Sequence, residues 1–254
     1  QNRLKKYFDL VRFNVNGEKT KIDIPELILD LNAKSEHISN MIRQQEWIEI
    51  DADKGYFNGH YDNLGNPVDG MTGTEVQMDL TTQVMCIMHD IATDDQIVKI
   101  MNSAEEFLQD KDSKGFRLCK PFKKLDLNLG RLTGFVYGYK EHGSKWMQQN
   151  VMLAYGLYSQ AFSSNASELV QNVFQLATNS NTSKIFPGIP SYFEPNNRGA
   201  YAYLSGSSAW LILTITTQLF GIRGENGNLR LDPKLNTNHF NSSGIASIKS
   251  TFRN

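Results

Sequence analysis

The sequence has little of what would indicate several common protein classes. It holds only two cysteines in 254 residues, too few for a disulfide scaffold. Its 26 basic and 27 acidic side chains give a net charge of −1 without a block of like charge, so neither nucleic acid nor a membrane surface is an expected partner. The longest apolar run, "AWLILTI", is far shorter than the roughly 20 residues of a membrane span. We therefore expect a soluble, cytoplasmic protein.

Familiar catalytic signatures are also missing. The sequence has no G-x-S-x-G motif and no P-loop, which disfavours a serine nucleophile or a nucleotide-binding loop of those kinds. The spacing of its cysteines and of His60, His89 and His142 does not suit a metal ion. We expect no metal and no cofactor. The sequence begins at Gln1 and stops at "SIKSTFRN" inside a strand-like pattern, so we expect it to be a piece of a longer polypeptide, whose remainder completes the fold.

Apolar periodicity predicts a mainly α-helical protein. Residues 25–48 form an amphipathic pattern. After it, long polar loops alternate with pairs of helices, in which an inner helix with few charges precedes an amphipathic outer one. The predicted inner helices are "MDLTTQVMCIMHDI", 150–162 and 207–220, and the outer ones are "DQIVKIMNSAEEFLQD" and 166–177. This order predicts a toroid of concentric helices over residues 1–220. Alternating leucines from residue 221 onward indicate a second, β-rich domain over 221–254.

In such a toroid the long loops at one end meet over a central cavity. The stretch "GYKEHGSKWMQQN", residues 138–150, is one of these loops. Lys140 and Glu141 stand near Tyr139 and Trp146, and such charged groups bind sugar hydroxyls while flat rings pack on a pyranose. The alternative interpretation is a surface loop with solvated charges and a packed tryptophan.

Two further loops carry candidate groups. In "SYFEPNNRGAYAYLSGSSAW", Glu194 precedes a proline, and Ser205 and Gly206 open a helix. The first amides of a helix favour an anion, although simple N-capping by a serine explains the same pattern. In "YFNGHYDNLGNPVDG", Asp62 and Asp69 could act on a substrate, but turn chemistry accounts for both of them, and we favour the turn.

Taken together, these stretches resemble the inverting β-glycoside phosphorylases of glycoside hydrolase family 94, which include cellobiose and oligoglucan phosphorylases. The resemblance rests on four motifs in order: "YFNGHYDNLGNPVDG", "GYKEHGSKWMQQN", "FEPNNRGAYAYLSGSSAW" and "LFGIRGENGNLRLDPKL". It implies the later helices of an (α/α)6 barrel, followed by the start of a C-terminal β-sandwich. It also implies attack by inorganic phosphate on a β-linked gluco-oligosaccharide, which gives α-glucose 1-phosphate. Phosphate is then a co-substrate, and a homodimer is an option that the sequence leaves open.

The resemblance also implies roles for individual residues. Ser205 stands where the family has a phosphate-binding threonine, and Gly206 matches the glycine beside it. Gln148 falls where many members place a phosphate-binding histidine, and this departure replaces a charged donor with a neutral one. The residues implied to shape the sugar site are Lys140, Glu141, Trp146, Glu194 and Tyr139.

The general acid is expected outside this chain, so no catalytic residue is assigned within it. In the family this acid is an aspartate in an Asp-Trp-Asn-Asp-like segment upstream of the first motif, and the sequence contains no such segment. Two other interpretations therefore stay open. One is a hydrolase or transglycosylase on β-glucans, which Gln148 favours. The other is a non-catalytic carbohydrate-binding fragment, which the absent aspartate favours.

Overall fold

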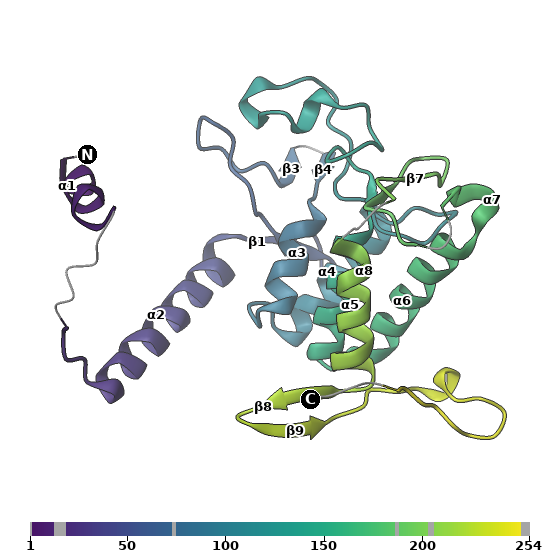
Figure 1. The fold of residues 1–254 in the computed structure, drawn as a ribbon. Coiled ribbons are helices and arrows are strands. Elements are labelled where there is room, and N and C mark those ends of the chain that lie inside the picture. Colours follow the sequence, from purple (N-terminus) through teal and green to yellow (C-terminus); the bar gives the residue numbers. More distant parts are fainter. Residues whose placement is uncertain (1, 13–18, 73–74, 186–187, 203–205, 250–254) are drawn as a thin grey trace. The chain divides into compact units, whose positions relative to one another are not determined.

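The computed structural model describes residues 2–12, 19–72, 75–185, 188–202 and 206–249. These residues divide into two units, Gln1–Asn40 and Met41–Asn254, which are described separately. The first unit holds α1 (Asn2–Val11) and most of α2 (Ile24–Gln45) (Figure 1). Among the described residues, no helix has the length and apolar character that crossing a bilayer requires.

Helix α2 is the amphipathic helix predicted from residue 25. The side chain of Asp23 accepts a hydrogen bond from the N–H of Glu26 at 3.0 Å, which caps its first turn. The helix ends three residues earlier than predicted because Trp47 enters strand β1 instead. There Trp47 pairs with Phe57, and their rings meet edge to face at a centroid distance of 4.9 Å.

The second unit combines helices with short antiparallel sheets (Figure 1). Its helices are α3 (Leu80–Met88), α4 (Asp94–Phe107), α5 (Met147–Ser159), α6 (Ser163–Thr178), α7 (Ser180–Ser183) and α8 (Gly206–Thr214), which continues as a π-helical turn, Ile215–Leu219. Short 3-10 turns lie at Leu127–Leu129, Leu132–Gly134 and Thr237–His239. The paired strands are β1 (Trp47–Glu49) with β2 (Gly55–Phe57), β3 (Gly70–Thr72) with β4 (Glu75–Gln77), and β8 (Ile222–Glu225) with β9 (Asn228–Leu231). A three-stranded sheet joins β5 (Lys145–Trp146), β6 (Tyr192–Phe193) and β7 (Gly199–Ala200). The predicted mainly α class is confirmed.

Helix α5 lies at the centre of this unit and packs against α3, α6 and α8. Nine of its 13 residues are buried, which confirms the predicted inner helix. Gly156 allows α5 to approach α3 closely, because a Cβ at that position would come within 3.0 Å of the Met88 side chain. The resulting core supports the N-terminal end of α5, where the candidate site lies.

The outer helices each bury one face and expose the other, as predicted. Helix α4 begins with a capping box in which Thr93 and Gln96 satisfy each other's backbone N–H groups. It buries Ile97, Ile100 and Ala104 and leaves Val98 exposed. Helix α6 likewise buries one face. The alternation of a buried helix with an amphipathic helix is therefore present for α3 with α4 and for α5 with α6.

Helix α8 differs from its prediction as a buried helix. Of its nine residues, only Ser207 and Thr214 are buried, while Ile212 is 67% exposed and Leu213 is 41% exposed. Its apolar composition led to the wrong prediction, because within the described part of the chain no helix covers this outer side. The hairpin of β8 and β9 confirms strand structure after residue 221. It lies in the same unit as the helices, and a separate domain there stays a prediction.

Candidate functional site

A cavity of about 550 Å³ opens at the N-terminal end of α5. Its wall comes from the loop after β2, the start of α3, the segment 118–132 and the stretch 141–149. The lining residues are His60, Val68, Asp69, Gln77, Asp79, Thr81, Leu118, Cys119, Phe122, Leu129, Arg131, Leu132, Glu141, Trp146, Gln148 and Gln149. Two of the three polar loops singled out in the sequence therefore meet on one wall.

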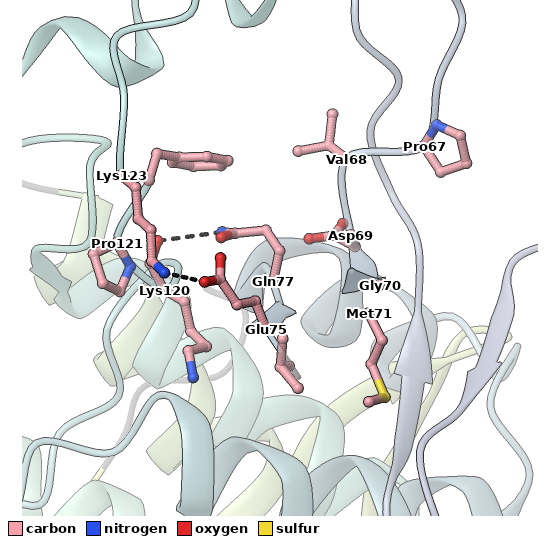
Figure 2. A pocket seen from close by; sticks show the side chains of 12 residues that line it. Pro67, Val68, Asp69, Gly70, Met71, Glu75, Gln77, Lys120, Pro121 and Lys123 are labelled. Atoms are coloured by element: carbon pink, nitrogen blue, oxygen red, sulfur yellow. Dashed lines mark hydrogen bonds and ion pairs between the residues drawn. The ribbon is translucent and has the colours of Figure 1, made fainter. Parts of the chain in front are cut away.

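A second hollow, of about 680 Å³, adjoins this cavity. Figure 2 shows its lining, in which Gln77 and Asp69 face the interior and Lys123 pairs with Glu75. Val68, Asp69, Gln77 and Phe122 belong to both walls. The two hollows are thus neighbours, and together they exceed the volume of a single hexose.

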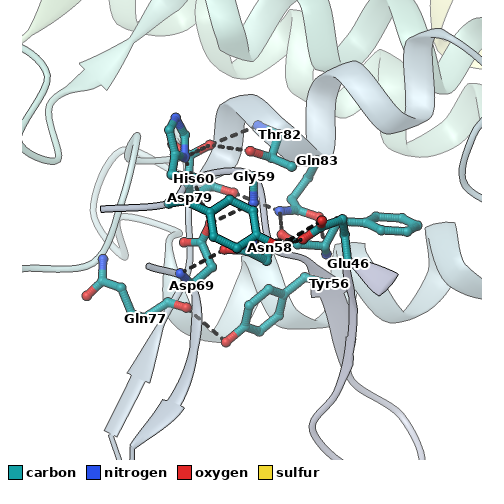
Figure 3. A network of polar contacts seen from close by, with 12 residues as sticks. Glu46, Tyr56, Asn58, Gly59, His60, Asp69, Gln77, Asp79, Thr82 and Gln83 are labelled. Carbon is teal, nitrogen blue, oxygen red and sulfur yellow. Dashed lines mark hydrogen bonds and ion pairs between the residues drawn. The ribbon is translucent and has the colours of Figure 1, made fainter. Parts of the chain in front are cut away.

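Asp69 and Asp79 form the acidic end of the cavity, shown in Figure 3. The Asp69 side chain is 1% exposed, and its carboxylate accepts the N–H of Gly59 at 3.1 Å. Asp79 caps α3 by accepting both the N–H and the hydroxyl of Thr82, at 2.8 and 3.0 Å. Burial, and secondarily the charge of Asp69, raise the pKa of Asp79 to about 6. Both carboxylates are therefore fixed in place before any ligand arrives.

His60 lies between these two acids. Its Nδ1 is 3.9 Å from the Asp69 carboxylate and 4.0 Å from that of Asp79, and its side chain is 55% exposed. The interaction with Asp69, helped by the charge of Asp79, raises the pKa of His60. The two carboxylates thus favour the protonated form of the imidazole, whose charge opposes theirs.

The stretch 138–150 folds as a tight turn that enters β5 and then α5. Tyr139 bridges to His142 across the turn. His142 is buried, donates through Nδ1 to the Phe135 carbonyl at 2.6 Å and accepts the N–H of Phe122 at 3.1 Å. Several polar groups of this stretch therefore hold the turn together rather than facing a ligand. Of this stretch, the residues that reach the cavity are Glu141, Trp146, Gln148 and Gln149.

The third polar loop joins the site through the three-stranded sheet. Strand β5 pairs with β6, so Trp146 lies opposite Tyr192, and their rings stack at 5.3 Å with an interplanar angle of 21°. Burial, followed by the charges of Glu194 and Glu141, raises the pKa of Tyr192. The charges of both glutamates therefore act on the phenol that stacks on the cavity-lining tryptophan.

Gly206, at the start of α8, lies against Gln148. A Cβ on Gly206 would come within 2.6 Å of Gln148 Oε1, so two of the three predicted phosphate-binding residues are neighbours. The third, Ser205, lies outside the described residues. The next residue, Ser207, is 1% exposed, and its hydroxyl has no hydrogen-bond partner among the described residues.

The remaining predicted sugar-site residues lie around the cavity rather than on its wall. Lys140 is in a left-handed backbone conformation, with φ of 48°, and its Nζ lies 5.1 Å from the Phe135 ring centroid and 6.0 Å from that of Tyr201. Tyr139 and Glu194 lie close enough to Tyr192 to influence its phenol. Their assignment as substrate ligands stays a prediction, as does that of Glu141 and Trp146.

Sequence reasoning missed several lining residues. Asp62 is the turn residue predicted, because its carboxylate accepts the backbone N–H groups of Leu64 and Asn66. Asp69 likewise has a structural role in its loop, where its carboxylate accepts the N–H of Gly59, but its buried side chain also forms part of the cavity wall. The available signal was its position next to strand β3, outside the turn itself. Asp79 falls within a predicted inner helix, and no local pattern indicates that it lines a cavity.

Comparison with known proteins identifies a family and distant relatives. The Glycosyl hydrolase 94 superfamily catalytic domain matches residues 5–221. The chain is 22% identical over 218 residues to a solabiose phosphorylase of Paenibacillus borealis, covering 82% of this chain and 28% of that protein. It is also 22% identical over 215 residues to a 3-O-beta-D-glucopyranosyl-beta-D-glucuronide phosphorylase of the same organism, covering 80% and 27%. The chain thus spans less than a third of the length of these curated relatives.

Proposed function

The chain belongs to the glycosyl hydrolase 94 superfamily, and from this premise we propose that it is part of an inverting phosphorylase of β-linked gluco-oligosaccharides. A phosphate oxygen attacks the anomeric carbon, the glycosidic carbon–oxygen bond breaks, and a carboxylic acid protonates the leaving oxygen. The products are α-glucose 1-phosphate and the shortened sugar. We propose that the general acid lies on polypeptide beyond this chain, which also completes an (α/α)6 barrel and continues into a β-sandwich after residue 221.

Within this scheme the residues of the chain bind and orient the reactants. The amide of Gln148 and the backbone N–H of Gly206 hold phosphate at the start of α8, where helix N–H groups favour an anion. The hydroxyl of Ser205 takes the part that the family's threonine has. Trp146 offers a ring to the sugar, and Glu141 accepts hydrogen bonds from its hydroxyls. Lys140, Tyr139 and Glu194 support this acceptor side through Tyr192 and the adjoining turn.

One observation carries the proposal. Gln148 lines the 550 Å³ cavity and also contacts the start of α8, so an anion held at the helix start would lie beside a sugar-sized space. Attack of phosphate on the anomeric carbon of a glycoside requires this proximity, because the reacting atoms must approach to about 3–3.5 Å. The phosphorylase names of both relatives support the same reaction class.

The test uses purified full-length protein, α-glucose 1-phosphate and a panel of β-gluco-oligosaccharide acceptors, with phosphate release as the measurement. We expect release with at least one acceptor, and cleavage of the product when phosphate is supplied. Absence of phosphate release with every acceptor would count against phosphorolysis. The same preparation tests the further proposals of a homodimer, by sedimentation, and of independence from added metals, by chelator treatment.

A second candidate is a hydrolase or transglycosylase acting on the same sugars. Gln148 favours it, because a neutral amide forms weaker hydrogen bonds to phosphate than a charged donor does. Sugar cleavage at an equal rate with and without phosphate would support this candidate. A third, the non-catalytic carbohydrate-binding fragment, predicts sugar binding to the full-length protein without turnover of any kind.

A further inference from the structure

The acidic end of the cavity presents hydrogen-bond acceptors to whatever binds there. Asp69 and Asp79 line this end, and their carboxylates are acceptor-only groups when ionised. Gln149 lines the same cavity, and its Oε1 is buried without a hydrogen-bond partner among the described residues. Glu141 adds a third carboxylate on the opposite segment. A ligand that satisfies these groups must donate hydrogen bonds.

The cavity wall has little positive charge to spare. Arg131 already binds Glu141, with its Nη2 at 3.0 and 3.3 Å from the two carboxylate oxygens. His60 lies beside Asp69 and Asp79. Lys140 is not part of this lining and holds its ammonium over the Phe135 and Tyr201 rings. Each cation near the acidic end, among the described residues, thus already has a partner.

A sugar hydroxyl or an ammonium group suits this wall, whereas a ligand carboxylate does not. The carboxylates of Asp69 and Asp79 line the same cavity, and the charge of Asp69 contributes, after burial, to the raised pKa of Asp79. A third anion would add repulsion, and it would leave the acceptor oxygens without donors. The difference between a ligand with a carboxylate and one without it also separates the two relatives by name. The name of one specifies a glucuronide, and the name of the other does not.

We infer, on the basis of the proposed phosphorylase function, that the acceptor sugar held against Asp69 and Asp79 is neutral or carries an amine, and that this site rejects uronic acids. The two carboxylates are the specificity-determining residues. They bind hydroxyl or ammonium donors and repel a carboxylate at the same position.

Three acceptors that differ only at carbon 6 test this inference: methyl β-D-glucoside, its 6-amino-6-deoxy analogue and methyl β-D-glucuronide. With full-length protein and α-glucose 1-phosphate, we expect kcat/KM for the glucuronide to be at least about tenfold below that for the glucoside. The amine should perform as well as the glucoside or better. Raising the salt concentration from 0.05 to 0.5 M should narrow the glucoside-to-glucuronide ratio, because salt screens the repulsion.

The Asp69→Asn and Asp79→Asn variants, alone and combined, assign the effect to these residues. Asparagine caps a helix as well as aspartate does, so α3 should keep its start in Asp79→Asn. In the combined variant, we expect kcat/KM for the glucoside to exceed kcat/KM for the glucuronide by no more than about threefold. Asp95→Asn, in the exposed first turn of α4, removes the same charge far along the chain from the cavity and should leave the ratio unchanged.

Binding measured by saturation-transfer NMR without α-glucose 1-phosphate separates this inference from the proposed reaction. Equal use or equal binding of glucoside and glucuronide overturns the inference and leaves phosphorolysis standing. Preferential binding of the glucoside without phosphate release with any acceptor overturns phosphorolysis and supports the inference. Failure of all three sugars to bind or react overturns the inference, and phosphorolysis falls with it when no gluco-oligosaccharide acceptor releases phosphate. An unchanged ratio in the combined variant and at high salt overturns the role of the two aspartates.

Discussion

Gln148 fills the space into which any side chain at position 206 would project, with its Oε1 2.6 Å from the position of a Cβ on Gly206. The contact joins α5 to the start of α8. Glycine leaves room for this amide, because a methyl group at position 206 would displace the end of the Gln148 side chain.

Gly206→Ala should therefore move Gln148 and weaken phosphate binding. We expect the KM for phosphate to rise about tenfold, because about 1.4 kcal/mol of binding corresponds to that factor, while the KM for sugar changes little. Gly134→Ala is a matched control, since a Cβ there would have no neighbour within 4 Å among the described residues. If Gly206→Ala leaves the KM for phosphate unchanged, the proposed phosphate position is wrong.

Trp146→Ala should weaken both the fold and sugar binding. The substitution removes the stacking on Tyr192, and such aromatic pairs contribute about 0.5–1.5 kcal/mol beyond the area they bury. We expect urea unfolding to show a loss of about 1–3 kcal/mol, with a higher KM for the sugar. Trp146→Phe keeps a ring and should lose much less of both. Equal effects of Trp146→Ala and Trp146→Phe would show that the aromatic ring contributes neither to stability nor to sugar binding.

The raised pKa of Asp79 predicts a pH dependence of stability. The pKa is about 6 in the folded chain against 3.8 as the ordinary value, so between pH 4 and 6 the folded state holds a proton that the unfolded state has lost. The contribution of Asp79 to the free energy of unfolding therefore falls as pH rises through this window, by about 1–3 kcal/mol. Above it the ionised, buried carboxylate keeps the fold destabilised.

Asp79→Asn removes this titration and should be more stable than the native protein at pH 7, with a smaller difference at pH 4. Urea unfolding at both pH values gives the comparison. The control is Asp126→Asn, because Asp126 caps an exposed 3-10 turn by accepting the N–H of Asn128 at 2.8 Å. A difference between native protein and Asp79→Asn that does not change with pH would contradict the assignment.

Lys145 predicts a dependence in the alkaline range with the opposite sign. Its side chain is fully buried, lies 3.7 Å from Asp110 and donates to Asn197. Burial lowers the pKa of Lys145 to about 8 from 10.5. Between pH 8 and 10.5 the unfolded chain therefore holds a proton that the folded chain lacks, and stability attributable to Lys145 rises with pH by about 1–3 kcal/mol.

Lys145→Met should abolish that rise. Asp110 keeps Arg117 as a partner at 2.5 Å, so the substitution does not leave an isolated buried charge. Urea unfolding at pH 7.5 and 10 compares the native protein with Lys145→Met, and with the exposed Lys124→Met as a control. The assignment fails if Lys145→Met and Lys124→Met both show the same change in unfolding free energy between pH 7.5 and 10 as the native protein.

Local patterns predicted the helices well and the site only in part. The periodicities of α2, α4, α5 and α6 are properties of contiguous sequence, and each helix is present. The exposure of α8 could not be read in this way, because "AWLILT" has the same composition whether or not a neighbour covers it. Burial depends on the rest of the fold, which a local pattern does not contain.

The same limit applies to the cavity. Glu141, Trp146 and Gln148 were identifiable because they stand together in one unusual stretch. Asp79 was not, and Asp69 was identified only as a turn residue, since the two are ten positions apart and each has an ordinary local role as a loop or cap residue. Their proximity arises from the connection between β2 and α3, and the charge of Asp69 adds to the effect of burial in raising the pKa of Asp79.

Asp79 has two roles, because one of its carboxylate oxygens starts helix α3 while the residue also forms part of the cavity wall. A ligand that donates to this carboxylate must share it with the amide of Thr82. Binding of a ligand at the acidic end of the cavity is thereby coupled to the local stability of the first turn of α3. A sugar bound at this end should slow amide hydrogen exchange in that turn before it affects the rest of the helix.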